Sequence, residues 1–183
     1  VNGGYVMLAE GAGDISHLLT SPDGVDWTDH GALDVRKVDG TPISSGPYGT
    51  PTAWYENGTW YLFYERGDLG VWLAKLTGPN RWVNVRDTPV LALGPGPYDR
   101  GAVALNQVIQ RDGVYYAFYH AAAERPWKEW TSCVARSRDL VNWEKPMLTG
   151  DGAGPYKACV PEPKMIEHVE RPDHMLDWLQ CIR

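Results

Sequence analysis

The stretch Asn57-Gly-Thr-Trp-Tyr-Leu-Phe-Tyr-Glu65 decides the fold of this 183-residue chain. It opens with an Asn-Gly pair, which readily adopts the positive φ angles of a type I′ turn, and continues as a run rich in aromatic residues. The residues before the turn, Gly49 to Glu56, form a second run with strand-like composition. The segment therefore predicts a β-hairpin.

The hairpin signal recurs at a fixed interval along the chain. Similar turn dipeptides stand 55 residues earlier and 55 residues later, at Asn2-Gly3 and Asp112-Gly113. The strand-like runs that follow the three turns end at equivalent places, namely Glu10, Glu65 and His120. A repeat of this length, holding about four short strands, is typical of one blade of a β-propeller.

We therefore expect an all-β fold of propeller blades, each with four antiparallel strands, as a single partial propeller domain over residues 1–183. Blade repeats fall near residues 1–47, 48–98 and 99–148, and residues 149–183 hold the start of a further blade and a divergent tail. Closed propellers typically have about four to eight blades, so about three are too few. Three accounts stay open: an excerpt of a larger propeller, an oligomer that completes the ring, or a small ring closed by residues 159–166.

The amino-acid composition limits the kinds of molecule that this chain is expected to bind. The net charge is -6 and no basic run occurs, so we expect no nucleic-acid partner, and no apolar run is long enough to predict a membrane partner. Nine Trp and ten Tyr favour a carbohydrate, whose flat faces suit rings with polar edges. The cysteines Cys133, Cys159 and Cys181 lack metal-ligand spacing, so we expect no metal, no cofactor and at most one internal disulfide. We also expect a secreted or periplasmic location.

A family resemblance rests on two copies of a Ser-x-Asp motif that ends in Trp, Ser21 to Trp27 and Ser137 to Trp143. Together with the hairpins and the Tyr-rich second strands, they resemble the five-bladed propeller glycoside hydrolases of family 43, with family 32 as a neighbour. The resemblance covers Val1 to about Leu148. It implies hydrolysis of a polysaccharide or oligosaccharide. We expect the Trp of each Ser-x-Asp motif, Trp27 and Trp143, to lie in the core. We also expect Trp27, Trp82 and Trp143 to occupy corresponding places in their blades.

The resemblance also implies three carboxylates: an Asp base, an Asp that orients it, and a Glu acid that is often followed by Pro. Glu162-Pro163 resembles the last of these. Thr50-Pro51 stands where the family has Asp-Pro at the start of an inner strand.

Strand geometry predicts where a site would lie. The first strand of a blade starts at the rim where its antiparallel second strand ends, which places residues 48–50 beside residues 65–68. Carboxylates that share a cavity can divide the roles of acid and base. We predict three catalytic carboxylates, namely Glu65, Asp99 and Glu162. We predict substrate contacts from Glu10, Arg66, Arg100, Asn106, His120 and Trp127.

Structural alternatives stay open for several of these residues. Glu65 and Arg66 could form an ion pair, Asp99 could serve as a turn residue, and His120 could be a hydrogen-bonded structural histidine. Trp127 could pack inside its loop. For the whole chain, the alternatives to a hydrolase are a non-catalytic carbohydrate-binding propeller and a fragment whose open blade edge self-associates or pairs with another chain.

Overall fold

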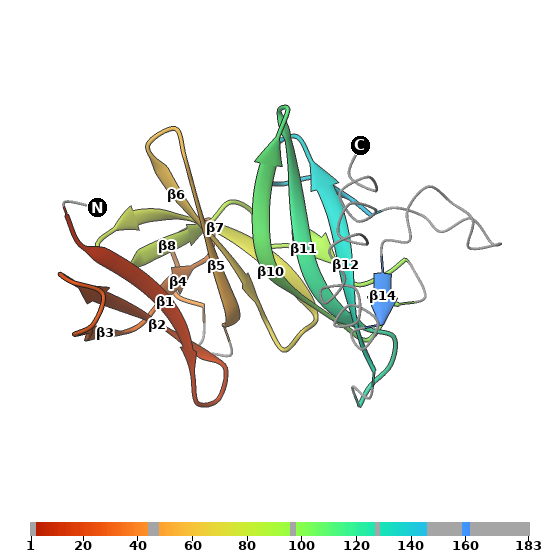
Figure 1. The fold of residues 1–183 in the computed structure, drawn as a ribbon, viewed down its shortest axis with the longest axis horizontal. Helices are drawn as coiled ribbons and strands as arrows, with labels where there is room; N and C mark the ends of the chain where they lie inside the picture. Colours follow the sequence, from red (N-terminus) through yellow and green to blue (C-terminus); the bar gives the residue numbers. More distant parts are fainter. Residues whose placement is uncertain (1–2, 44–47, 96–97, 127–128, 146–158, 162–183) are drawn as a thin grey trace. The chain divides into compact units, whose positions relative to one another are not determined.

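The computed structural model describes residues 3–43, 48–95, 98–126, 129–145 and 159–161. The chain divides into two compact units, Val1–Ala92 with Ala104–Asn106 and Leu93–Val103 with Gln107–Arg183, which are described separately below as the first and second unit. The described residues form strands, turns and loops, with no helix (Figure 1). Accordingly, no helix within these ranges could span a membrane.

The first unit holds two sheets. Sheet A has three strands in the order β1-β2-β3. Their bounds are β1 (Tyr5–Gly11), β2 (Ile15–Ser21) and β3 (Thr28–Ala32). Sheet B has the order β4-β8-β7-β6-β5, with β9 paired to β7. Its strands are β4 (Asp34–Arg36), β5 (Gly49–Glu56), β6 (Thr59–Glu65), β7 (Gly70–Gly78), β8 (Arg81–Asn84) and β9 (Leu91–Ala92).

Sheet C lies mainly in the second unit and has the order β10-β11-β12-β13, with β14 paired to β12. Its strands are β10 (Ala102–Arg111), β11 (Val114–Ala122), β12 (Trp130–Ser137), β13 (Trp143–Glu144) and β14 (Cys159–Pro161). Cys133 is disulfide-bonded, and the residue opposite it across β12 and β14 is Cys159.

The predicted hairpins are confirmed where the structure describes them. Asn57 and Gly58 have φ angles of 49° and 78°, and Asp112 and Gly113 have 52° and 74°, as a type I′ turn requires. Glu56 pairs with Thr59 directly across the first of these turns. The turn chemistry therefore fixes the register of β5 against β6.

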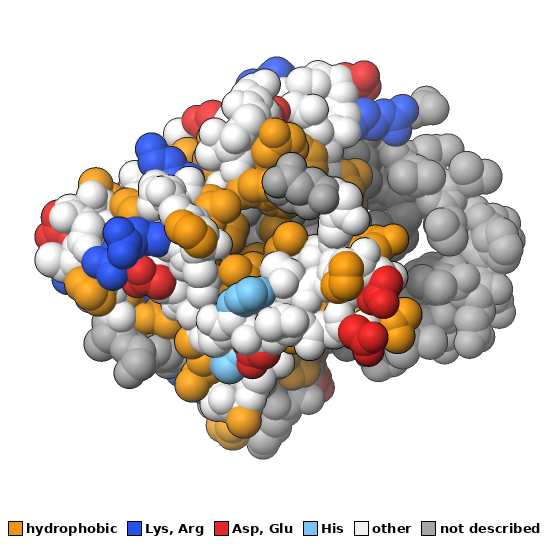
Figure 2. Space-filling view, turned by 90° about the vertical axis from the view of Figure 1, so that its left-hand side faces the viewer, with side chains coloured by type: hydrophobic (Ala, Val, Ile, Leu, Met, Phe, Trp, Pro, Cys, Tyr) orange, Lys and Arg blue, Asp and Glu red, His pale blue; other side chains and the backbone are white. Residues whose placement is uncertain are grey.

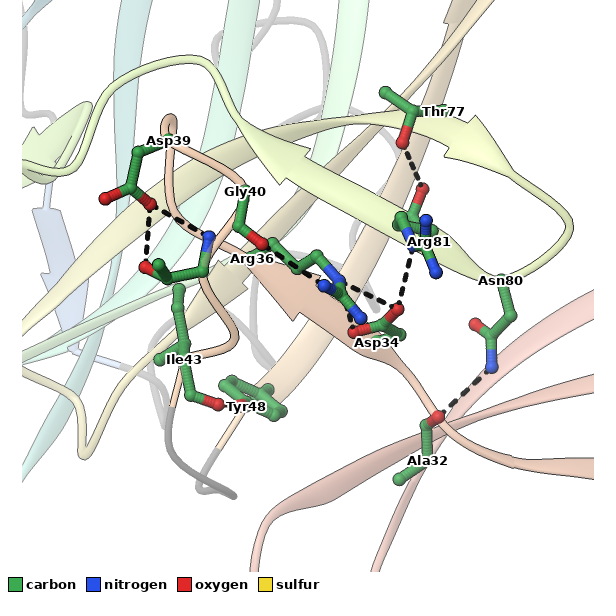
Figure 3. Close-up of polar contacts among 11 residues, drawn as sticks. Ala32, Asp34, Arg36, Asp39, Gly40, Ile43, Tyr48, Thr77, Asn80 and Arg81 are labelled. Atoms are coloured by element: carbon green, nitrogen blue, oxygen red, sulfur yellow. Dashed lines mark hydrogen bonds and ion pairs between the residues drawn. The ribbon is translucent and has the colours of Figure 1, made fainter.

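The expectation of four antiparallel strands per blade holds for β5 to β8. It needs a correction at the outer edge of sheet B, where a further strand pairs in the parallel direction. There β4 pairs in parallel with β8. Figure 3 shows the contacts that hold β4 in place: the Asp34 carboxylate accepts bonds from Arg36 at 2.9 Å and from Arg81 at 3.1 Å. Burial raises the pKa of Asp34, but these two guanidinium groups outweigh it and hold the pKa below its ordinary value.

Sheets A and B share the hydrophobic core of the first unit. The buried cluster contains Leu18 of β2, Val35 of β4, Leu62 and Tyr64 of β6, and Trp82 of β8. The Tyr64 hydroxyl donates a 2.7 Å hydrogen bond to Asn84, which satisfies the polar tip of a ring that is otherwise enclosed. Hydrophobic side chains also reach the surface among charged ones (Figure 2).

The two Ser-x-Asp motifs form the same loop. In each copy the Asp carboxylate accepts backbone N–H bonds from the residues two and three positions later, and the Trp ring donates to a carbonyl of its own loop. The rings of Trp27 and Trp143 are only partly buried, so the prediction that they lie in the core is wrong. Trp82 is 3% exposed and is a core residue.

Candidate active site

Two carboxyl groups of the first unit meet at the start of β5. Gly49 pairs with Glu65 at the end of β6, as predicted from the antiparallel geometry. Glu10 stands at the equivalent place in sheet A, where it pairs with Ser16 near the start of the next strand. We refer to Glu10 and Glu65 together as the carboxyl pair.

Gly49 brings the pair together because it has no side chain. A Cβ added there would overlap Oε1 of Glu65 and would lie 3.0 Å from Oε2 of Glu10. Both carboxyl groups therefore occupy space that any other residue at position 49 would take. This close approach to a backbone is a common reason for glycine within a strand.

Thr50 is held in a strained conformation beside the pair. Its φ angle is 46°, which is rare for a β-branched residue, and the following Pro51 further disfavours helical backbone angles at this position. The Thr50 N–H donates a short hydrogen bond to Oε2 of Glu10, and the pairing of β5 with β6 is irregular between Gly49 and Thr52. Backbone strain and bulges of this kind concentrate at functional sites.

Glu65 is buried and Glu10 is exposed. The Glu65 side chain accepts a 2.5 Å hydrogen bond from the backbone N–H of Asp68, and the residue is 4% exposed. Burial raises the pKa of Glu65 from its ordinary 4.5 to about 7, and the charges of Asp68, Asp14 and Glu10 add to this increase. The Asp68 N–H bond favours the ionised form and only partly offsets the increase.

The alternative that Glu65 pairs with Arg66 is wrong, since the described residues hold no such ion pair. Instead, the Arg66 guanidinium lies over the Trp72 ring, 5.9 Å from its centroid. Its buried Nε has no hydrogen-bond partner among the described residues. The substrate-binding role predicted for Arg66 stays a prediction.

Asp99, in the second unit, is not only a turn residue, because its side chain is held by bonds from two other side chains. Its Oδ2 accepts 2.6 Å and 3.2 Å bonds from Lys145 Nζ and the Tyr119 hydroxyl. Asp99 and Lys145 side chains are 4% and 12% exposed, so this is a buried ion pair. Burial lowers the pKa of Lys145, while the Asp99 carboxylate favours its charged form. The other Asp99 oxygen, Oδ1, is buried with no partner within the described ranges.

The remaining predicted site residues lie in varied surroundings. His120 is half-buried on β11, with its ring centroid 5.0 Å from that of Trp130. Arg100 and Asn106 are exposed, and the Asn106 carbonyl accepts a bond from Thr52. Glu162 and Trp127 lie outside the described residues. Sequence reasoning did not find Lys145, because nothing in its local sequence marks it as a partner of Asp99.

No group of three or more His, Cys, Asp or Glu side chains in the described ranges is arranged to hold a metal ion. The carboxyl pair itself offers acid and base chemistry. A protonated carboxyl group beside a second carboxyl group can divide the roles of acid and base.

Comparison with known proteins shows the fold. No protein-family model matches the chain, and no curated protein matches its sequence. The xyloglucan PUL protein GH43B of Bacteroides ovatus matches 84% of this chain, with a TM-score of 0.53 at 13% identity. The GH32 beta-fructofuranosidase BmSUC1 of Bombyx mori matches 86%, with a TM-score of 0.57 at 15% identity. A thermostable family-43 glycoside hydrolase matches 80%, with a TM-score of 0.56 at 19% identity.

The matched region spans only part of each of these proteins: 29% of the Bacteroides chain, 35% of the Bombyx chain and 51% of the thermostable hydrolase. Within that region the likeness confirms the fold expected from the repeats and the hairpins. The chain has the all-β fold of the propeller glycoside hydrolases of families 43 and 32.

Proposed function

We propose that this chain contributes to a glycoside hydrolase that cleaves a polysaccharide or oligosaccharide by acid and base catalysis with carboxyl groups. The observation that carries this proposal is the carboxyl pair, in which a buried Glu65 with a pKa of about 7 lies beside an exposed Glu10. Glycosidic bond cleavage needs one carboxyl group that keeps a proton near neutral pH and another that is ionised.

The two members of the pair differ in their access to solvent, and this difference suggests separate roles. Glu10 is exposed and can meet a sugar directly. Glu65 holds the proton that the leaving-group oxygen needs, and its burial keeps that proton bound near neutral pH. The strained Thr50 fixes the Glu10 carboxylate through its N–H, so the pair is oriented before a substrate arrives.

Asp99 enters the proposal as a fixed carboxylate. Its Oδ2 is held at 2.6 Å by the Lys145 ammonium group, in a buried ion pair. We assign the proton transfer to the carboxyl pair, and the catalytic role predicted for Asp99 stays a prediction. The catalytic role predicted for Glu162, like the sugar contacts predicted for Arg100, Asn106, His120 and Trp127, stays a prediction.

A second candidate function is a carbohydrate-binding propeller that does not hydrolyse its ligand. Thr50-Pro51 favours it, since this site carries a hydroxyl where the resembling enzymes carry an Asp. The buried Asp99–Lys145 pair favours it as well, because Oδ2 of this carboxylate is already engaged by the protein's own ammonium group. Pairing through an open blade edge also stays a prediction, and β1 is an edge strand of sheet A as described, with Tyr5 56% exposed.

Turnover of a panel of aryl glycosides separates the two functions. We expect release of the aryl group from at least one pentoside or fructoside at pH 6, and a loss of at least about a hundredfold in Glu10→Gln, as expected when a catalytic carboxyl group is removed. Asp26→Asn, which alters an exposed carboxyl group in the same unit, is the matched control and should keep full activity. Saturable glycan binding without any turnover would favour the binding propeller.

A further inference from the structure

A hollow on the second unit is not explained by the proposed function. Its volume is about 420 Å³, and its lining includes Tyr116, Arg136, Arg138, Asp139, Asn142 and Glu144. This volume falls within the range of about 300 to 1,000 Å³ that is usual for small-molecule sites.

The hollow lies at the opposite end of the sheet from His120. Tyr116 pairs with Arg136 near the hairpin end of β11, whereas His120 pairs with Ser132 near the other end. Gly101, two residues after Asp99, donates its N–H to the carbonyl of Ala122, at the same end as His120. The hollow is therefore separate from His120 and Asp99, two of the predicted site residues of this unit.

Both acidic groups that line the hollow are already engaged. Glu144 accepts a 2.9 Å bond from Arg136. Asp139 accepts the backbone N–H groups of Val141 and Asn142 at 2.9 and 2.7 Å. Burial alone would raise the pKa of Asp139, but these bonds, together with those from the Asn142 side chain and Ser137, lower it to about 2. Neither carboxylate is thus available to bind a cation.

Arg138 is the cation that this hollow leaves available. It is exposed, and no described residue forms an ion pair or a side-chain hydrogen bond with it. A guanidinium group suits a carboxylate because it can donate two parallel N–H bonds to the two oxygens. The charge balance of the lining, with Arg136 and Glu144 paired and Asp139 engaged by its loop, therefore favours an anionic ligand.

The other lining groups suit a sugar. The Tyr116 ring is half-buried and offers an apolar surface with a polar edge. The Asn142 amide donates through Nδ2 to Asp139 at 2.8 Å, and its carbonyl oxygen can accept from a hydroxyl group. We propose that this hollow binds a saccharide that carries a carboxylate, such as a uronic acid unit, with Arg138 on the carboxylate and Tyr116 against the ring.

The test is a binding titration of the full chain that does not depend on turnover. Amide chemical shifts would be followed by NMR during addition of an oligogalacturonate, of a neutral galactose oligosaccharide of the same length, and of acetate. We expect the acidic oligosaccharide to shift the amides of Tyr116, Arg136 and Asn142 and to bind at least about tenfold more tightly than the neutral one, as a charge-assisted bond predicts.

Two substitutions in the hollow and one control outside it show which residues bind the oligosaccharide. Arg138→Gln should weaken the acidic oligosaccharide at least about fivefold and leave binding of the neutral one unchanged. The matched control is Arg111→Gln, which removes an exposed arginine of the same sheet that does not line the hollow and should leave the affinity within about twofold. Tyr116→Leu should weaken both oligosaccharides.

Several results would overturn the proposal. These are equal affinity for the acidic and neutral oligosaccharides, shifts that acetate reproduces in full at the same concentration, no shifts at the named amides, or unchanged affinity in Arg138→Gln. Glu65→Gln should bind the acidic oligosaccharide as well as the unaltered chain does. A failure of this proposal is therefore distinguishable from a failure of the proposed hydrolase.

Discussion

Glu65→Gln is expected to lower the turnover of a glycoside substrate at least about a hundredfold, because glutamine keeps the shape of the side chain and cannot donate the proton. The pH dependence should change as well. In the unaltered chain the protonated form of Glu65 is needed, so the rate should fall as the pH rises through about 7. The residual rate of Glu65→Gln should lack this decrease. Initial rates between pH 5 and 9 measure both effects.

The Glu65 variant needs controls for folding and for simple loss of charge. Asp26→Asn should keep both the rate and the pH profile, since Asp26 is exposed and away from the carboxyl pair. Glu65→Gln should also keep the circular dichroism spectrum of a β-protein. If Glu65→Gln turns over substrate at the same rate, with the same decrease near pH 7, then Glu65 is not the proton donor.

Lys145→Met is expected to destabilise the fold by about 3 to 5 kcal/mol, since it leaves the buried Asp99 carboxylate without a compensating charge. Its Nζ also donates a 2.8 Å bond to the Gly94 carbonyl, so the same substitution removes a second bond. Urea denaturation at pH 7 measures the free energy of unfolding. Adding Asp99→Asn to Lys145→Met should recover part of the loss, because the amide is neutral.

A substitution in the exposed ion pair Arg136–Glu144 is the matched comparison for Lys145→Met. Its side chains are 56% and 72% exposed, so Glu144→Gln should change the free energy of unfolding by less than about 1 kcal/mol. An equally small change in Lys145→Met would mean that water reaches Asp99, and would contradict the buried ion pair described here.

Much of the fold could be predicted from the sequence because turn chemistry and strand pairing are local. The pair Asn57-Gly58 determines the turn, the turn determines the register, and the register places Gly49 opposite Glu65. The proximity of Glu10 to Glu65 followed from the repeat, since the two residues stand at or next to the ends of equivalent strands.

Other features depend on contacts that no local pattern encodes. Lys145 lies 46 positions from Asp99 in the sequence, and only the folded chain brings them together. The left-handed conformation of Thr50 goes against the preference of a β-branched residue before proline, so propensity alone predicts the opposite. Trp82 and Trp143 occupy similar places in the repeat, yet their burial depends on which neighbouring strands cover them.

The most direct test of the central claim is the titration of the Glu65 side-chain carboxyl group. Carbon-13 NMR of glutamate-labelled protein follows each carboxyl group with pH, and Glu65→Gln identifies the signal by its absence. The account predicts a midpoint near 7 for Glu65, and a lower midpoint in Glu10→Gln, where one neighbouring negative charge is gone. A midpoint at the ordinary value of 4.5 would contradict the account, because Glu65 would then hold no proton to donate near neutral pH.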